Sequence, residues 1–173
     1  MPYLRVYGPI YPFTYSIPFL QVVKASNKYY FAEKKTMKRV TSIGGIFFKC
    51  KNPDAQMDWY EQHLGIAMDK YGSSFQWRRA DDKEKKGHTA WGPLEENSDY
   101  FGNPSQQYMI NYRVENLPLL VEQLKKEGVT IVDEIEAFEY GKFVHILDLE
   151  GNRVELWEAN DELYEKMLNA VTK

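Results

Sequence analysis

A repeated pattern constrains the fold of this chain more than any other feature. Residues 43–51 have the two-residue period of a strand and lead into Asn52, a helical pattern and Gly65. A second strand pattern leads in the same way into Asn116, a helical pattern and Gly128, and the two Asn residues are 64 positions apart (116 minus 52). Asn is a favourable N-cap, and Gly commonly ends a helix. The sequence therefore predicts two tandem copies of one strand-helix unit.

Short strand patterns follow both helices. The predicted strands are Ala67–Tyr71, Ser74–Arg79 and His88–Pro93 in the first half, and Thr130–Ala137, Lys142–Asp148 and Arg153–Glu158 in the second. The chain is predicted to consist of a non-core extension over residues 1–36 and a domain over 37–173. Within the domain, module 1 spans 40–94, module 2 spans 106–158, and an amphipathic helix spans 160–172. The pattern predicts an α+β fold of two βαββ(β) units and a C-terminal helix.

Composition excludes several classes of protein. The chain has 173 residues, 43% of them hydrophobic, which is enough for a core, and it has no apolar run long enough to span a membrane. Twenty-two Lys and Arg against 25 Asp and Glu give a net charge of -3, which does not favour nucleic-acid binding. The single cysteine, Cys50, cannot form an intrachain disulfide, so we expect a cytoplasmic protein. From the charge and the lack of a long apolar run we expect no nucleic-acid or membrane partner.

The first 36 residues differ from the rest in composition. They are rich in aromatic residues, and Pro9, Pro12 and Pro18 interrupt any apolar core that a secretory signal would need. Met37 then opens the segment that leads into the first strand pattern. Two interpretations stay open: residues 1–36 are the product of an upstream start codon, or they form an arm that packs on a partner subunit.

Three motifs carry a resemblance to a known family. They are Gly45-Ile46-Phe47-Phe48-Lys49 leading to Asn52-Pro53, Met109-Ile110-Asn111-Tyr112-Arg113-Val114 leading to Leu117, and the ending Asp148-Leu149-Glu150-Gly151-Asn152-Arg153-Val154-Glu155-Leu156-Trp157-Glu158. Over about residues 40–158 the chain resembles the vicinal oxygen chelate superfamily, which includes glyoxalase I, extradiol dioxygenases, and fosfomycin and bleomycin resistance proteins. The resemblance implies two βαβββ modules whose mixed sheets curl around a shared cleft, commonly in a homodimer.

The metal site of that superfamily does not match well. Its metal-using members hold divalent Zn, Ni, Mn or Fe with ligands, commonly His and Glu, from the first and last strands of each half. The first-strand positions match Gly45 and Met109, and the last-strand positions match Ala90 or Trp91 and Glu155. Glu155 alone is a metal-binding residue type, whereas such sites need about three protein ligands. We therefore expect no metal and no other cofactor.

An atypical metal site is the alternative. It would combine Glu155 with His145 and His88, provided that the three side chains converge. Either histidine is also explained as a hydrogen-bonded residue of a sheet, and Glu155 as a polar residue paired with a cation.

Strand alternation predicts which side chains face the cleft. The candidate ligand-binding residues are Phe47, Lys49, Trp77, Asn111, Arg113, His145 and Trp157. Arg113 and Lys49 could clamp a carboxylate or phosphate, or Arg113 could simply neutralise Glu155. Trp77 and Trp157 could stack on a planar ligand or fill the core, and Gly45 and Met109 are expected to leave an apolar cleft floor.

These residues support three functional hypotheses. The preferred one is a protein that binds a small anionic or aromatic molecule without the usual metal. The second is a metal-dependent lyase, isomerase or dioxygenase that uses the atypical site with Glu155. The third is a metal-free enzyme with Glu155 as the general base. Whether the protein is an enzyme is therefore left open by the sequence.

Overall fold

The computed structural model describes residues 22–25, 28–31 and 38–171, which belong to two separate units. In the first unit, β1 (Val22–Ala25) and β2 (Lys28–Phe31) pair as antiparallel strands. The sequence did not predict this pair. The remainder of the predicted extension over residues 1–36 lies outside the described residues, so both interpretations of that segment stay predictions.

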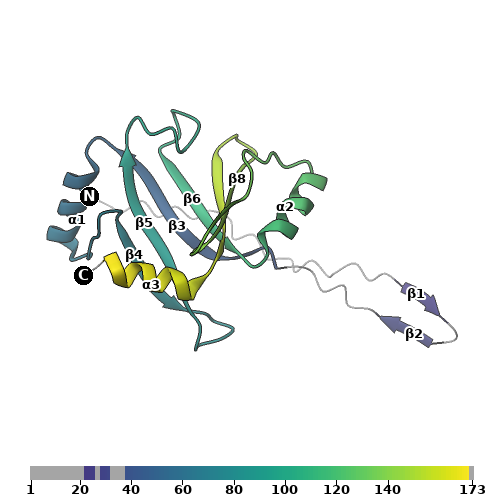
Figure 1. The fold of residues 1–173 in the computed structure, drawn as a ribbon. Coiled ribbons are helices and arrows are strands. Elements are labelled where there is room, and N and C mark those ends of the chain that lie inside the picture. The colour runs from purple at the N-terminus through teal and green to yellow at the C-terminus, as the bar shows by residue number, and fades with distance from the viewer. Residues whose placement is uncertain (1–21, 26–27, 32–37, 172–173) are drawn as a thin grey trace, which may run out of the picture. The chain divides into compact units, whose positions relative to one another are not determined.

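The second unit is built on one open mixed sheet of seven strands (Figure 1). Its strands, in spatial order, are β4 (Ser73–Arg78), β5 (Lys86–Glu95), β3 (Val40–Cys50), β6 (Tyr108–Val114), β9 (Arg153–Ala159), β8 (Gly141–Leu147) and β7 (Glu136–Phe138). Its helices are α1 (Pro53–Leu64), α2 (Leu117–Lys126) and α3 (Asp161–Val171). The α+β fold with a C-terminal helix, predicted from the sequence, is thereby confirmed.

The predicted repeat is visible in how the strands pair. In the first half β3 pairs with β5 in parallel, and in the second half β6 pairs with β9 in parallel. The two halves join where β3 and β6 pair in antiparallel orientation, so the sheet is continuous across the junction. In Figure 1, α1 lies at the β5 end of this sheet and α2 at the β8 end.

Both helices of the repeat begin and end as predicted, within one residue. The side chains of Asn52 and Asn116 accept hydrogen bonds from the third residue beyond them, at 3.0 and 3.1 Å. Gly65 and Gly128 follow the helices with positive φ angles of 65° and 81°. The helices nevertheless differ in burial: α2 buries four apolar side chains and α1 buries none.

The predicted strand Ala67–Tyr71 is wrong. The structure has only an isolated bridge between Asp69 and Gly72 in that region. The Asp69 side chain accepts a hydrogen bond from the backbone N–H of Tyr71 at 2.7 Å, which closes a local turn. Because the side chain satisfies this backbone group, the segment turns back instead of extending.

The predicted strand Thr130–Ala137 is shorter than expected. Ile131 makes an isolated bridge to β8, and a regular strand is present only at β7. Between them the carboxylate of Asp133 accepts a hydrogen bond from the backbone N–H of His145 at 2.8 Å. A side chain thus takes the place of a backbone carbonyl, and the regular ladder is interrupted there.

The C-terminal helix α3 follows β9 directly and crosses in front of β5 and β4 (Figure 1). It spans Asp161–Val171, which lies within the range 160–172 predicted from the sequence. The apolar side chains of Leu163 and Met167 are only partly buried, and Tyr164 is the buried residue in the described part of this helix. The helix brings Tyr164 and Met167 to the edge of a cavity on the sheet.

Candidate functional site

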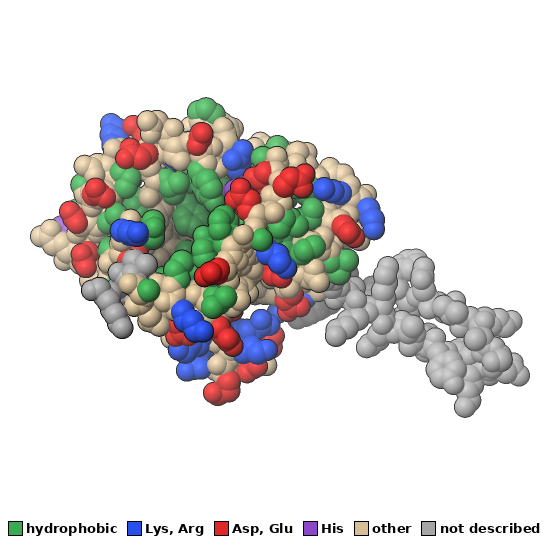
Figure 2. Space-filling model, viewed as in Figure 1, with side chains coloured by type: hydrophobic (Ala, Val, Ile, Leu, Met, Phe, Trp, Pro, Cys, Tyr) green, Lys and Arg blue, Asp and Glu red, His purple; other side chains and the backbone are tan. Residues whose placement is uncertain are grey.

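A cavity of about 570 Å³ lies against the central and C-terminal strands of the large unit. Figure 2 shows it as a hollow lined by hydrophobic side chains, with acidic side chains beside it. The residues around it are Gly44, Phe47, Tyr71, Ala90, Tyr100, Asn111, Asp133, Glu134, Glu136, Phe138, Tyr140, Phe143, Val144, His145, Glu155, Trp157, Tyr164 and Met167. The cavity has the composition of a small-molecule site, which is mostly apolar with a few placed polar groups.

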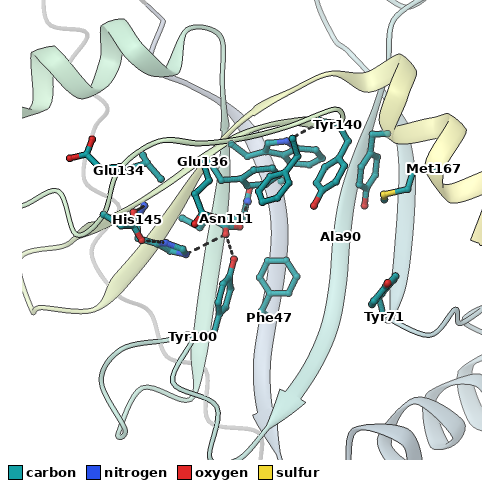
Figure 3. Close-up of a pocket in the computed structure, with 18 residues that line it drawn as sticks. Phe47, Tyr71, Ala90, Tyr100, Asn111, Glu134, Glu136, Tyr140, His145 and Met167 are labelled. Carbon is teal, nitrogen blue, oxygen red and sulfur yellow. Dashed lines mark hydrogen bonds and ion pairs between the residues drawn. The ribbon is translucent and has the colours of Figure 1, made fainter.

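Glu155 is the centre of the polar side of this cavity. Its carboxylate accepts hydrogen bonds from the hydroxyl of Tyr100 and from the side-chain amide of Asn111. The Nε2 atom of His145 lies 3.3 Å from Glu155 Oε1. Glu155 is 3% exposed, and a buried carboxylate is costly without hydrogen-bonding partners of this kind. Figure 3 shows Tyr100, Asn111 and His145 converging from three segments.

His145 is held between two carboxylates. Its Nδ1 atom lies 2.7 Å from Asp133 Oδ2, and its other ring nitrogen faces Glu155. Burial alone would lower the pKa of His145, but the contacts with Glu155 and Asp133 outweigh burial and raise it. The imidazolium form is therefore favoured in this position.

Strand register places these groups side by side. Asn111 on β6 is the parallel partner of Glu155 on β9, and His145 on β8 is its antiparallel partner. Side chains that are direct partners in a sheet point to the same face. Three neighbouring strands thus bring the amide, the carboxylate and the imidazole to one point.

Tyr100 comes from the linker between the modules, and Arg153 fixes its position. The Arg153 guanidinium donates a hydrogen bond to the Tyr100 carbonyl at 2.9 Å. Gln106 accepts from the Arg153 N–H and donates to its carbonyl, both at 2.8 Å, and thereby ties the linker to β9. Burial first, and then the charge of Glu155, raise the pKa of Tyr100, so its hydroxyl stays protonated and remains a donor.

Gly44, and not the expected Gly45, reaches the cavity. The register of β3 against β6 shifts between Ile43 and Gly45, which marks a bulge. A Cβ atom at Gly44 would overlap with Oδ1 of Asn111. The absence of a side chain there lets β3 approach the polar group of the site closely.

Aromatic rings form the other wall of the cavity. Phe143 stacks on Trp157 with ring centroids 5.6 Å apart, and Tyr140 meets the edge of Phe143 at 5.7 Å. In Figure 3, Tyr71 and Met167 lie on the side opposite His145, with Phe47 between them. The cavity therefore has a polar end and an apolar end.

Of the ligand-binding residues predicted from the sequence, four line this cavity and three do not. Phe47, Asn111, His145 and Trp157 line it, together with the predicted base Glu155; Lys49, Trp77 and Arg113 do not. Their role in binding stays a prediction. Met109, expected on the cleft floor, is 1% exposed and is not among the lining residues, so the floor next to Glu155 is the polar side chain of Asn111.

Arg113 faces a different partner from the one expected. Its guanidinium pairs with Asp161 of α3 at 2.5 Å, donates to the His88 carbonyl at 3.1 Å and lies 4.7 Å from the Trp157 ring centroid. Burial alone would raise the pKa of Asp161, but His88 and Arg113 lower it below its ordinary value. Arg113 thus holds α3 on the sheet and does not neutralise Glu155.

Lys49 and Trp77 also lie elsewhere. The ammonium of Lys49 is 5.4 Å from the ring centroid of Phe101 in the linker, and Trp77 donates to the Thr89 hydroxyl at 3.0 Å. Without Arg113 and Lys49 in the cavity, the expectation of an anionic ligand loses the groups on which it depended.

The side chains do not fit the divalent metal site of the superfamily. Within residues 38–171, no three His, Cys, Asp or Glu side chains are arranged to hold a metal ion. Gly45 has no donor atom, and Glu155 already has a partner at each carboxylate oxygen. His88 is buried beside Asp161 and Tyr164 and lies outside the cavity, so the atypical trio with Glu155 and His145 does not come together.

Comparison with known proteins agrees with this architecture. Residues 42–156 match the model of the Glyoxalase/Bleomycin resistance protein/Dioxygenase superfamily. The chain belongs to this superfamily. The resemblance seen in the sequence motifs is thereby confirmed. A search of curated proteins gives no match.

Solved structures with the same fold include methylmalonyl-CoA epimerases. A Streptomyces coelicolor enzyme variant in complex with 2-nitronate-propionyl-CoA is 16% identical, with 70% of this chain and 99% of that chain covered and a TM-score of 0.54. The Mycobacterium tuberculosis enzyme is 20% identical, with 73% and 93% covered and a TM-score of 0.49. At 16% identity the likeness to the Streptomyces coelicolor structure shows the fold alone. Across the described residues, no helix is long and apolar enough to cross a membrane.

Sequence reasoning missed several polar residues that line the cavity, among them Tyr100, Asp133 and Glu136. Tyr100 lies in a linker without periodicity, and Asp133 and Glu136 lie in a segment interpreted as a plain strand. An Asp in the middle of a strand pattern is a usable signal, since its side chain often replaces a backbone partner. For Tyr100 the sequence contains no comparable signal.

Proposed function

We propose that this protein binds a small molecule with a planar apolar body in the cavity beside Glu155, and that binding does not require a metal ion. One observation carries the proposal: the cavity is walled by aromatic rings and has one polar end. Phe47, Tyr71 and Tyr140 surround the space that a planar body would fill (Figure 3). The network around Glu155 would fix the orientation of the ligand.

Glu155 acts in this proposal as a fixed polar group and not as a catalytic base. Both of its oxygens already accept hydrogen bonds, from Tyr100 and Asn111, and His145 lies beside it. A substrate proton would compete with these donors for the carboxylate. The arrangement supports recognition of a ligand better than proton transfer.

A homodimer in the cytoplasm is part of the proposal. Superfamily membership supports the dimer, and the single free thiol, Cys50, supports a reducing compartment. Light scattering coupled to gel filtration would test the dimer: a mass equal to one chain across micromolar concentrations would contradict it.

The test of binding is a thermal-shift screen of planar metabolites followed by calorimetry, with protein purified without a metal-binding tag. We expect binding with one site per chain that is unchanged by a chelator and weakened about five- to thirtyfold in Tyr140→Ala, since an aromatic contact of about 1–2 kcal/mol is lost. Phe75→Ala is the matched control, because Phe75 is a half-exposed ring on β4 outside the cavity.

Metal analysis of the purified protein tests the alternative functions. One equivalent of a divalent ion in the purified protein, with binding or turnover abolished by a chelator, would favour the metal-dependent lyase, isomerase or dioxygenase. Turnover that persists without metal and disappears in Glu155→Gln would instead favour the metal-free enzyme.

A further inference from the structure

The cavity carries an excess of negative charge. Asp133, Glu134, Glu136 and Glu155 line it, and no Lys or Arg of residues 38–171 is among its lining residues. His145 is its one basic side chain, and it already lies between two of these carboxylates. Even with the imidazolium form of His145, the carboxylates remain in excess. A cavity lined in this way attracts cations and repels anions.

A buried acceptor without a partner lies at the same end. Asn111 is 2% exposed, and its amide nitrogen donates to Glu155, while its Oδ1 atom has no hydrogen-bond partner. That atom lies against the backbone of Gly44, and both residues line the cavity. Unpaired buried acceptors are costly and rare. Oδ1 has almost no accessible surface as the cavity stands, so an N–H donor on a ligand can satisfy it only if the Asn111 side chain rotates toward the cavity.

The aromatic wall also suits a cation. Aromatic rings attract a cation over their faces, and the Lys70 ammonium already lies 4.5 Å from the ring centroid of Tyr71 at the cavity edge. Burial first, and then the carboxylates of Glu155 and Glu136, raise the pKa of both Tyr100 and Tyr140. The negative field therefore extends across the cavity to the aromatic side.

We propose that the ligand of this cavity is an organic cation, namely a protonated amine or amidinium group on an aromatic body. This inference rests on the proposed function and specifies its ligand class. The charged group lies at the acidic end of the cavity, beside Glu136, Glu155 and the Asn111 side chain, and the aromatic body lies among Phe47, Tyr71 and Tyr140.

Three probes with one aromatic body test the charge. Calorimetry compares 1-naphthylmethylammonium, 1-naphthylmethanol and 1-naphthylacetate at pH 7 and low salt. We expect the ammonium to bind about tenfold tighter than the alcohol, and the acetate to bind most weakly. The N-trimethyl analogue keeps the charge and removes the donors, so we expect it to bind less tightly than the ammonium because it cannot donate hydrogen bonds to the polar groups at the acidic end of the cavity.

A matched pair of variants tests the location. Glu136→Gln removes one carboxylate of the cavity and is expected to weaken ammonium binding about three- to tenfold with no effect on the alcohol. Glu139→Gln removes the same charge from the neighbouring loop outside the cavity and is expected to leave both affinities unchanged. If both variants lost the same amount of ammonium affinity, net charge and not the position of the carboxylate would explain the effect, and the assignment would be overturned.

The outcomes separate the two proposals. Equal affinity for the ammonium and the alcohol, or tighter binding of the acetate, would overturn the cation assignment while binding in the cavity stands. If none of the naphthyl probes binds, the cation assignment fails, and the screen of planar metabolites then decides whether the cavity binds a small molecule at all.

Discussion

The buried ion pair between Arg113 and Asp161 offers a quantitative test of how α3 is held on the sheet. Its N–O distance is 2.5 Å, and the two side chains are 7% and 33% exposed. Replacing Arg113 by Met keeps the stem of the side chain, and replacing Asp161 by Asn keeps its shape. Each change leaves the other polar group without its charged partner in a largely buried place.

The expected coupling energy follows from burial. Two unit charges about 4 Å apart interact by about 4 kcal/mol at an effective dielectric of 20, and part of this is offset by their desolvation. A charged hydrogen bond of this kind contributes about 1.5–3 kcal/mol net. We therefore expect a double-mutant cycle of Arg113→Met and Asp161→Asn to give a coupling of about 2 kcal/mol. The cycle cancels the separate contacts of Arg113 with His88 and Trp157.

The matched control is the pair Arg39 and Glu127, which has better geometry and less burial. Its guanidinium makes two hydrogen bonds to the carboxylate, at 2.5 and 2.7 Å, yet the side chains are 44% and 36% exposed. Solvent screens such a pair, so we expect a coupling too small to resolve clearly. Urea unfolding monitored by circular dichroism measures both cycles. A control coupling as large as that of Arg113 and Asp161 would refute the argument that burial decides.

Three further predictions concern the site and its support. Gly44→Ala places a methyl group where Oδ1 of Asn111 lies, so we expect a loss of about 1–3 kcal/mol in urea unfolding and weaker ligand binding in calorimetry. The pKa of His145 is raised above 6.5, so the stabilisation that its charged form contributes is fully present below pH 6.5 and is lost as the pH rises through the folded-state pKa. The difference in free energy of unfolding between the unchanged protein and His145→Gln should therefore shrink above pH 6.5. Leu117→Ala should cost about 2–5 kcal/mol because Leu117 is fully buried, whereas Leu119→Ala on the exposed face should cost far less; equal losses would contradict this packing.

Local signals in the sequence were sufficient for the repeat and its helices. Asn52 and Asn116 cap their helices through contacts within three residues, and the glycines after the helices need only their own backbone freedom. Alternation likewise placed Glu155 and Trp157 on one face of β9. Such features depend on neighbouring residues, so a sequence specifies them directly.

The rest of the site depends on contacts between distant segments. The partner of Arg113 comes from α3, and periodicity on β6 says nothing about the distance to Asp161. Tyr100 reaches Glu155 because Arg153 holds the linker, which no strand or helix pattern expresses. The bulge on β3 shifts the cavity-facing residue from Gly45 to Gly44, and a one-residue shift of this kind is invisible in a two-residue period.

The two copies of the repeat contribute unequally to the cavity. The first module supplies Gly44, Phe47, Tyr71 and Ala90, which are apolar or lie at the apolar end, whereas the ionisable groups other than tyrosine come from the second module. The two modules therefore differ in the chemistry that they bring to the cavity. Substitutions in the first module would therefore change the shape of the cavity while the charged network stays intact, so the shape of the cavity and its charge can be altered separately.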